Sequence, residues 1–531
     1  MGKKNNPDYI IVGGGSAGCV LASRLSEDKD STVTLIEAGG WDYNPLIHMP
    51  AGYYPLMKAG LVNWKYSSTP QRSLDGRRIY CPRGKVIGGS SSINGMVYSR
   101  GHYSDYDNWA QLGNDGWSFD ECLPYFIKAE NFAIPDQPDR GYNGPIRTLR
   151  YGIHHPYSIA FVEACRNTGL PYNTDLNVGE QDGVGATDST MSGTRRCSTA
   201  VGYLHPALNR GNLNVVVRAM VSRILLDKDR AVGVEYVRHG KVRRLYCNKE
   251  IILSGGAVNS PKILQLSGIG DPDDLRRAGI EVRHELPGVG RNLQDHPAVT
   301  VKQLSTEPIS LLPYTKPLQS AKAALEYALT GKGPAAYHGG EAQAFLRTRS
   351  GLPAPDLQCF MINILYTDSG RKIINQHGFM TYFTLQRPES RGSIKIASAD
   401  PRAAPLIDLN YFAVQSDLAT MREGVKMCRE IVAQPAFDRL RGAEYAPGAD
   451  ATSDEQIDQF LRRETFSNFH LSGTCKMGRD SDAVVDNRLR VRGLSGLRVA
   501  DASIMPVVVS GNINAPTIMI AEKAASLTAT E

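Results

Sequence analysis

The stretch 8-DYIIVGGGSAG-18 decides the fold of this chain. A short apolar run that leads into GxGxxG predicts a buried parallel strand, a tight turn and the start of a helix. In this pattern Gly13 permits the turn, Gly15 lets a pyrophosphate approach the backbone, and Gly18 lets the helix pack closely on the strand. The stretch therefore predicts the first strand–helix unit of a dinucleotide-binding domain.

The start of this helix and the next apolar run predict what the unit binds. Unpaired N–H groups at Ser16 and Ala17, aided by the helix dipole, attract phosphate. Glu37, which ends the run 33-VTLIE-37 and precedes Ala38, is spaced to accept a hydrogen bond from an adenosine ribose hydroxyl. A carboxylate at that point repels the 2′-phosphate of NADP, so we expect FAD or NAD.

Length and composition favour a globular enzyme of two domains, because 531 residues exceed what one compact domain usually holds. The formal net charge of +6 is small for this length, and no long block of like charge occurs, which argues against a nucleic-acid partner. The nine cysteines include no CxxC pair. They favour reduced thiols in a cytosolic setting over a disulfide framework or a zinc site.

The sequence also indicates the cellular location of the protein. Residues 1–7 contain no apolar segment typical of a signal peptide, and no run of about eighteen apolar residues occurs in the chain. We therefore expect a cytoplasmic protein without a transmembrane segment. Peripheral contact with the inner face of the membrane stays open.

Two further strand–turn–helix units lie far from the first. The run 250-EIIL-253 precedes two glycines, and Ser260 and Pro261 suit the N-cap and the first position of a helix. The run 497-LRVAD-501 leads toward an apolar helix expected over residues 517–525. Three separated units predict one domain assembled from discontinuous segments, which we place at residues 1–155, 195–303 and 465–531.

The rest of the chain, residues 156–194 and 304–464, has a different pattern. A helix-like stretch at 318–329 precedes strand-like runs at 356–364, 379–385 and 392–396. Strands without a βαβ rhythm fit an antiparallel sheet. The predicted fold class is α/β plus α+β: a Rossmann-like FAD-binding domain and an antiparallel-sheet substrate-binding domain.

The segment 82-PRGKVIGGSSSINGMV-97 helps to separate FAD from NAD, which GxGxxG alone cannot do. Small residues packed this densely let the backbone approach a flat ligand, and their N–H groups can face phosphates or ring oxygens. The alternative interpretation is an ordinary surface loop.

Six segments together resemble the glucose–methanol–choline (GMC) oxidoreductases, flavoproteins that oxidise alcohols, and they occur in the family's order. Within the family the chain is most similar to choline dehydrogenase-like and other alcohol-oxidising bacterial members. The segments are 35-LIEAGG-40, 84-GKVIGGSS-91, 255-GGAVNSPKILQLSGIG-270, 286-LPGVGRNLQDH-296, 469-FHLSGTCKMG-478 and 499-VADASIMP-506.

The resemblance implies FAD in an extended pose, with its adenosine over Glu37 and its isoalloxazine ring between the two domains. Some members attach FAD covalently through a histidine at the position of Ile93, so FAD is expected to be non-covalent here. The residues expected to contact FAD are Gly13, Gly15, Ser16, Ala17, Gly18, Glu37, Ala38, Val86, Gly88, Gly89, Ser90, Asn94, Gly95, Met96, Val97, Val221, Asp501, Ala502 and Asn512.

The resemblance also implies a catalytic pair, His470 and Asn514. The family oxidises a primary alcohol to the aldehyde by hydride transfer to flavin N5. The hydroxyl proton needs an acceptor that titrates near neutrality, which suits a histidine, and the developing alkoxide needs a hydrogen-bond donor. On the residues alone, His470 could equally be structural and Asn514 a turn residue.

Glu341 and Phe469 are the predicted substrate contacts. In choline-oxidising relatives an acid and aromatic rings hold the trimethylammonium group, and Tyr337, Phe345, Phe360, Tyr366, Phe379 and Phe383 are available here. Relatives that act on neutral alcohols also carry the glutamate, so the alcohol is not fixed. Adjacent His154 and His155 do not predict a metal site, and no metal is expected.

Two alternatives remain beside a general alcohol oxidoreductase. One is choline dehydrogenase, and the other is a GMC-type hydroxynitrile lyase with a structural flavin. The expected partners are a small-molecule alcohol and an electron acceptor, which is either oxygen or a quinone or other carrier.

Overall fold

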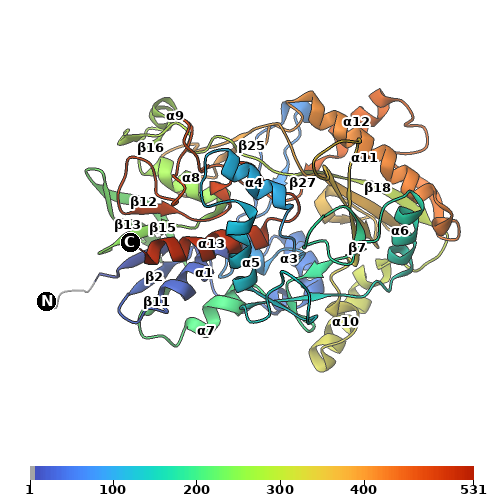
Figure 1. The fold of residues 1–531 in the computed structure, drawn as a ribbon, viewed down its shortest axis with the longest axis horizontal. Helices are drawn as coiled ribbons and strands as arrows, with labels where there is room; N and C mark the ends of the chain where they lie inside the picture. Colours follow the sequence, from blue (N-terminus) through green and yellow to red (C-terminus); the bar gives the residue numbers. More distant parts are fainter. Residues whose placement is uncertain (1–5, 531) are drawn as a thin grey trace.

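A five-stranded parallel sheet organises one side of the molecule in the computed structural model, which describes residues 6–530 (Figure 1). The strands lie in the order β11–β2–β1–β15–β28, with the first strand of the chain at the centre. Their bounds are β1 Tyr9–Val12, β2 Val33–Ile36, β11 Leu213–Val216, β15 Glu250–Leu253 and β28 Leu497–Val499. One sheet thus joins three distant parts of the chain, as the three units predict.

Helices follow the three predicted strands. They are α1 Ser16–Leu25, α8 Gly256–Leu266 and α13 Asn514–Ala529, and α1 packs against α13. The start of α8 is a correction, because the predicted N-cap Ser260 lies inside the helix. Pro261 is tolerated there because the carbonyl of Ala257, which its missing N–H would have bonded, accepts from the Thr474 hydroxyl at 2.7 Å.

A second sheet, of seven strands paired antiparallel, fills the other side of the molecule (Figure 1). Its order is β26–β18–β23–β20–β19–β7, and β27 also pairs with β18. The bounds are β7 Gly183–Ala186, β18 Pro297–Ser305, β19 Ala342–Leu346, β20 Leu357–Ile362, β23 Gly378–Leu385, β26 Arg441–Ala446 and β27 Phe466–Ser467.

This pairing corrects one predicted boundary. A division after residue 303 cuts β18, which pairs with β23 from Ala298 to Leu304. Because all of β18 is hydrogen-bonded into the antiparallel sheet, the chain changes sheets at Pro297. The remaining division into domains stays a prediction.

Helices cover one face of the antiparallel sheet and bury its apolar side chains. The helices α6 Pro156–Asn167 and α11 Gln415–Ala433 contact its strands, and α12 Asp454–Glu464 packs on α11. The predicted helix at 318–329 is α10, Pro317–Thr330. Within residues 6–530, no helix is both long and apolar enough to cross a bilayer.

The other α-helices are α2 Pro45–His48, α3 Tyr53–Ala59, α4 Tyr103–Gln111, α5 Phe119–Ala129, α7 His205–Ala207 and α9 Pro272–Arg277. A three-stranded antiparallel sheet comprises β12 Ala219–Asp227, β13 Arg230–Arg238 and β14 Lys241–Tyr246. Short strands complete the fold: β3 Tyr66–Ser67, β4 Tyr80–Cys81, β5 Glu130–Phe132, β6 Ile146–Arg150, β8 Asp188–Ser189, β9 Met191–Ser192, β10 Arg195–Arg196, β16 Ile269–Gly270, β17 His284–Glu285, β21 Tyr366–Thr367, β22 Lys372–Ile373, β24 Ser393–Lys395 and β25 Leu406–Asp408.

Candidate active site

A long cavity runs from the carboxyl ends of the parallel strands to the antiparallel sheet. Gly13, Glu37 and Ser254, which follow β1, β2 and β15, line one end, whereas Phe360 of β20 and Tyr382 of β23 line the other. Open parallel sheets bind ligands outside the carboxyl ends of their strands. The cavity therefore has a nucleotide end and a second end walled by the antiparallel sheet.

The nucleotide end has the features that a pyrophosphate needs. Gly13 has φ +101°, and a Cβ there would lie 2.5 Å from the Ser254 carbonyl oxygen. A Cβ on Gly18 would lie 1.8 Å from the Gly13 carbonyl oxygen, so close packing requires glycine at both positions. At the start of α1, Gly15 provides no side-chain cap, which leaves the N–H groups of the first turn for a ligand.

Glu37 is buried at this end and is already held by the backbone. Its carboxylate oxygens accept from the N–H groups of Gly14 at 2.8 Å and Gly39 at 2.6 Å. Burial raises the pKa of Glu37, and these N–H groups oppose that shift. The fixed carboxylate retains lone pairs that can accept from a ribose hydroxyl.

Most of the predicted cofactor residues line the cavity, but three do not. Gly18 and Gly88 shape the backbone beneath it, and Val86 packs in a small core with Ile47 and Leu56. The remaining sixteen line it: Gly13, Gly15, Ser16, Ala17, Glu37, Ala38, Gly89, Ser90, Asn94, Gly95, Met96, Val97, Val221, Asp501, Ala502 and Asn512.

Asp501 lines the cavity while joining the start of α8 to the turn that follows β28. Its Oδ2 accepts from the N–H of Gly256 at 2.8 Å and from the hydroxyl of Ser260 at 2.6 Å. Its Oδ1 accepts from the N–H of Ser503 at 2.7 Å. Burial raises the pKa of Asp501 despite these bonds. The carboxylate thus positions backbone around the cofactor site.

A buried arginine supports the loop that carries Asn94. Arg196 donates to the Asn94 side-chain oxygen at 2.6 Å and to the Ser91 carbonyl at 3.2 Å. The same amide oxygen accepts from the Met96 N–H at 3.1 Å. Burial lowers the pKa of Arg196 to about 9. With its oxygen occupied, the amide of Asn94 offers its NH₂ group to a ligand.

His470 lies deep at the ring end, between a second histidine and an asparagine. Its Nδ1 is 2.9 Å from Nδ1 of His296, and its Nε2 is 3.2 Å from Nδ2 of Asn512. Its backbone N–H donates to Asp295 at 2.7 Å, and Asn468 Nδ2 lies 3.3 Å from Nδ1. Three segments of the chain, around residues 295–296, 468–470 and 512, therefore meet at this imidazole.

The hydrogen bonds assign the proton of His470. An amide nitrogen can only donate, so Nε2 of His470 accepts from Asn512. The Gln358 side chain donates to the Asn512 oxygen at 3.3 Å and thereby fixes the orientation of that amide. With Nε2 as the acceptor, the proton of neutral His470 lies on Nδ1, and the acceptor for it is Nδ1 of His296 at 2.9 Å. In this tautomer the Asn468 amide, 3.3 Å from Nδ1, does not donate to the ring, and Nε2 is the basic nitrogen.

Electrostatics keep both imidazoles neutral. Burial lowers the pKa of His470 well below 6.5, and His296 and Arg83 lower it further. Burial alone lowers the pKa of His296 to about 3. A neutral His470 is able to accept a proton at neutral pH.

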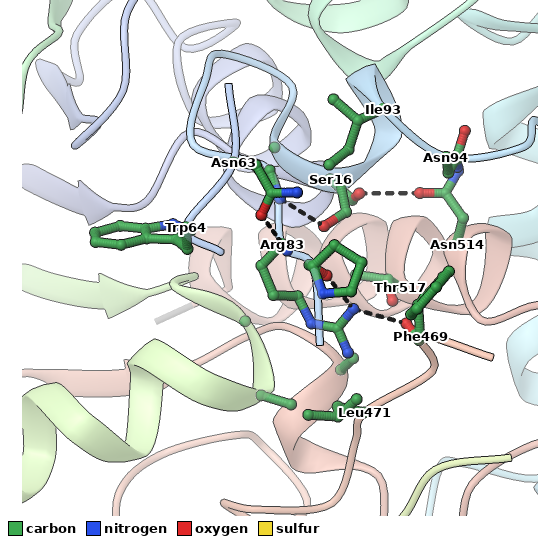
Figure 2. Close-up of a pocket in the computed structure, with 18 of the residues that line it drawn as sticks. Ser16, Asn63, Trp64, Arg83, Ile93, Asn94, Phe469, Leu471, Asn514 and Thr517 are labelled. Carbon is green, nitrogen blue, oxygen red and sulfur yellow. Dashed lines mark hydrogen bonds between the residues drawn. The ribbon is translucent and has the colours of Figure 1, made fainter. Parts of the chain in front are cut away.

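The catalytic pairing of His470 with Asn514 stays a prediction; both residues line the cavity, and Asn514 makes a different contact in this structure. Asn514 is the first residue of α13, and its side-chain oxygen accepts from the Ser16 hydroxyl at 2.9 Å (Figure 2). Asn512, two residues earlier, makes the contact with His470. The turn at Gly511, with φ +87°, places Asn512 at the ring end before the helix begins. Sequence spacing alone could not distinguish the two asparagines.

Phe469 lines the cavity, and its backbone is strained. Its φ is +64°, an uncommon value for a residue other than glycine. Arg83 donates to its carbonyl at 2.9 Å (Figure 2), and the Ser467 hydroxyl accepts from its N–H at 2.8 Å. Strain held by neighbours is typical of functional sites, and here it orients the adjacent His470.

Glu341 is not among the residues that line the cavity, contrary to prediction. Its carboxylate accepts from the N–H groups of His154 at 3.1 Å and His155 at 2.9 Å, just before α6. Buried acids are drawn to unpaired N–H groups at helix starts, and this one stabilises α6. Among the described residues that line the cavity, the carboxylates are Glu37 and Asp501.

Aromatic rings form much of the wall. Of the predicted rings, Phe360 and Tyr366 line the cavity, while Phe345, Phe379 and Phe383 are buried in the core. The rings that the sequence did not single out are Tyr53, Tyr54, Trp64, Tyr382 and Phe466. The wall also contains His338, whose Nε2 lies 2.9 Å from the Ser189 hydroxyl.

Comparison with known proteins shows which family and which proteins this chain is similar to. Two models described as GMC oxidoreductase match residues 7–298 and 388–521. The mitochondrial choline dehydrogenase of Mus musculus is 46% identical over 99% of this chain and 89% of its own length. The oxygen-dependent choline dehydrogenase of Rhizobium etli is 44% identical over 98% of this chain and 94% of its own.

Solved structures share the fold over the whole chain. Pyridoxine 4-oxidase from Mesorbium loti superposes with a TM-score of 0.91 at 32% identity, covering 99% of this chain and 100% of that one. A formate oxidase of Aspergillus oryzae RIB40, studied for its FAD modification, superposes with a TM-score of 0.93 at 27% identity, covering 100% and 99%.

Proposed function

We propose that this chain, which belongs to the GMC oxidoreductase family, oxidises a primary alcohol to the aldehyde with His470 as the base. It is an FAD-dependent oxidoreductase that acts on CH–OH donors. The observation that carries the proposal is the contact between Nε2 of His470 and the Asn512 amide at the end of a cavity whose other end suits a nucleotide.

The residues present fit FAD. The uncapped start of α1 and the Gly13 turn suit its pyrophosphate, and Glu37 suits its ribose. The 89–97 loop suits its ring. When bound, the isoalloxazine supplies the hydride acceptor. We propose that FAD is bound non-covalently. Ile93 of this loop lines the cavity, and its alkyl side chain cannot form a covalent bond to the flavin.

Each residue at the ring end has a distinct part in the proposed reaction. Nε2 of His470 accepts the hydroxyl proton, and the NH₂ group of Asn512 donates to the developing alkoxide. His296 accepts a hydrogen bond from the Nδ1–H of His470 and is a positioning residue. The aromatic wall excludes water from the reacting carbon.

Choline is a second candidate substrate. The named relatives are choline dehydrogenases, and rings such as Tyr366 and Tyr382 can attract a trimethylammonium group. Glu341 does not line the cavity, so the carboxylate that was expected to hold the trimethylammonium group is missing from the lining. Comparing choline with its uncharged isostere 3,3-dimethyl-1-butanol tests this point. A site for choline reduces its flavin faster with the cation, and a site for neutral alcohols reverses that order.

Anaerobic mixing with a panel of primary alcohols tests the main proposal. Bleaching of the flavin absorbance by at least one alcohol is expected. A flavin that stays oxidised with every alcohol, in a protein that cleaves a cyanohydrin, would indicate a lyase instead. Acid precipitation should release FAD into the supernatant, whereas yellow protein in the pellet would contradict non-covalent binding.

For the electron acceptor and the location we propose oxygen and the cytoplasm, with peripheral contact at the inner face of the membrane. The acceptor is supported by the name of the Rhizobium etli relative, and peroxide release during turnover measures it. A quinone or other carrier is the alternative if peroxide is absent. All nine cysteines are free thiols, which supports a reducing compartment.

A further inference from the structure

Arg196 is a buried cation without an acidic partner. It is one of four buried arginines within residues 6–530 and is 2% exposed. The other three, which each form an ion pair with Glu130 or Glu250 at 2.7–2.8 Å, are Arg100, Arg140 and Arg498. Buried charges are normally paired, because removing an ion from water costs free energy that only a counter-charge offsets. A bound anion is therefore expected to act on Arg196.

The hydrogen bonds of Arg196 to the described residues go to neutral oxygens. Its Nε donates to the carbonyl of Ile47 at 2.7 Å. Its Nη1 donates to the carbonyl of Ser91 at 3.2 Å and to the side-chain oxygen of Asn94 at 2.6 Å. Its Nη2 is buried and has no hydrogen-bond partner among residues 6–530. These contacts hold the guanidinium in place and leave its charge uncompensated.

The titratable neighbours of Arg196 do not supply a negative charge. Burial raises the pKa of Tyr53 and lowers the pKa of His338 to about 4, so both rings are neutral at pH 7. Arg196, with its pKa lowered to about 9, is protonated at that pH. Its charge also contributes to the lowered pKa of His338, which lines the cavity. The buried charge therefore acts on the wall of the cavity.

Asn94 links this charge to the cofactor site. It lines the cavity (Figure 2), while its amide oxygen accepts from Arg196. A cation bonded to the oxygen of an amide polarises the whole group, which makes the NH₂ group a stronger donor. Asn94 belongs to the 89–97 loop, which the proposed function assigns to the flavin ring.

We propose that Arg196 is the fixed counter-charge for the reduced flavin ring and acts on it through the Asn94 amide. The inference rests on the proposed function, in which the ring accepts a hydride. A hydride brings two electrons and one proton to the neutral oxidised ring, so the reduced ring carries one negative charge. A nearby positive charge stabilises that anion and raises the reduction potential. The uncapped start of α1 is available for the pyrophosphate, whose charge does not change on reduction.

The midpoint potential of the bound flavin tests the proposal. It is measured anaerobically on the full-length holoenzyme by equilibration with a redox dye. Arg196→Met removes the charge and keeps a side chain of similar shape. The affinity for reduced flavin relative to oxidised flavin should fall at least tenfold, which lowers the potential by about 30 mV for a two-electron couple. A purely structural loss would weaken both forms equally and leave the potential unchanged.

Three further variants sharpen the test. Arg196→Gln removes the charge but keeps a hydrogen-bond donor, so its potential should also fall, and it decides the question if Arg196→Met does not retain FAD. Arg196→Lys keeps the charge and should stay near the wild-type potential. The matched control is Arg195→Met, which removes the adjacent, exposed cation and should leave the potential unchanged.

Three results would overturn the proposal. The first is a wild-type potential in the two neutral variants, in which case weaker binding of oxidised FAD would assign Arg196 to the pyrophosphate or to the loop. The second is a fall in Arg196→Lys as large as in Arg196→Met, and the third is an equal fall in Arg195→Met. Dye equilibration uses no alcohol, so a failure of the proposed function appears separately, as flavin that alcohols do not bleach.

Discussion

The two ends of the cavity are lined by different chemical groups. At the nucleotide end, backbone N–H groups and glycines form most of the site, and Glu37 is held by the N–H groups of Gly14 and Gly39, which are 23 and 2 residues away. At the ring end, side chains meet from afar: His470 contacts His296 across 174 residues. The difference indicates a division of labour, with affinity for FAD set at one end and reaction rate at the other.

Loss of the base should have the largest effect. His470→Ala should lower the rate of flavin reduction by alcohol by about 10²–10⁴-fold, the usual contribution of a positioned acid–base group. FAD should stay bound, because the nucleotide end is intact. Stopped-flow absorbance measures the rate and the FAD content together. A wild-type rate would show that another residue is the base. Loss of FAD would contradict the inference that the nucleotide end alone sets the affinity for FAD.

The pH profile of the wild type sharpens the same prediction. The pKa of His470 is lowered well below 6.5, so the imidazole stays neutral as the pH falls through neutrality. Flavin reduction should therefore be constant above pH 6.5 and fall only at lower pH. An inflection above 6.5 would contradict the buried, unprotonated base.

The two asparagines give the next comparison. Asn512→Ala should lower the reduction rate by about 10²–10³-fold, because the alkoxide loses a donor. Asn514→Ala should leave that rate close to wild type, because its side-chain oxygen accepts from the Ser16 hydroxyl. The same stopped-flow assay with saturating FAD decides between them. The reverse order of effects would restore Asn514 as the catalytic partner.

Glu37 tests the nucleotide end. Glu37→Ala removes a charge-assisted acceptor worth roughly 1.5–3 kcal/mol, so the Kd for FAD should rise about tenfold to a hundredfold. With FAD saturating, flavin reduction should stay near wild type. Titration of the apoprotein followed by flavin fluorescence measures the Kd. Glu37→Gln serves as the control that keeps the shape and removes the charge.

The smallest effect concerns stability at acid pH. Burial lowers the pKa of His338 to about 4, so the unfolded chain binds a proton there that the folded chain does not, below about pH 6.5. The free energy of unfolding should fall as the pH is lowered from 6.5 toward 4, by up to about 1.4 kcal/mol per pH unit for this group. Denaturant titrations of His338→Gln should show a shallower pH dependence. His239→Asn, at an exposed histidine, should retain the wild-type slope.

The two ends of the cavity differ in how much of their structure could be predicted from the sequence. The strands, the Gly13 turn and the uncapped helix start were predictable because each depends on neighbours in the sequence. Ser260 was misplaced as an N-cap because Thr474, far along the chain, satisfies the carbonyl that Pro261 leaves unpaired. Local rules cannot anticipate such a distant partner.

The ring end shows the same limit more strongly. The motif segments identified His470, but neither its proton nor its neighbours are encoded locally. Asn512 rather than Asn514 faces it because a glycine turn and the start of α13 separate two asparagines that look alike in sequence. The Glu341 carboxylate lies outside the cavity lining because it accepts hydrogen bonds from the N–H groups of His154 and His155, just before α6.

The sequence by itself determined the parallel sheet, the dinucleotide site and the family, since glycine conformation, apolar periodicity and helix starts are properties of short segments. Tertiary structure alone decided which side chains contact the two ring nitrogens of His470, which asparagine lies beside it and which leucines of α10 stay exposed. Each of these depends on burial and on partners from distant segments, and a side chain acquires both only when the chain folds.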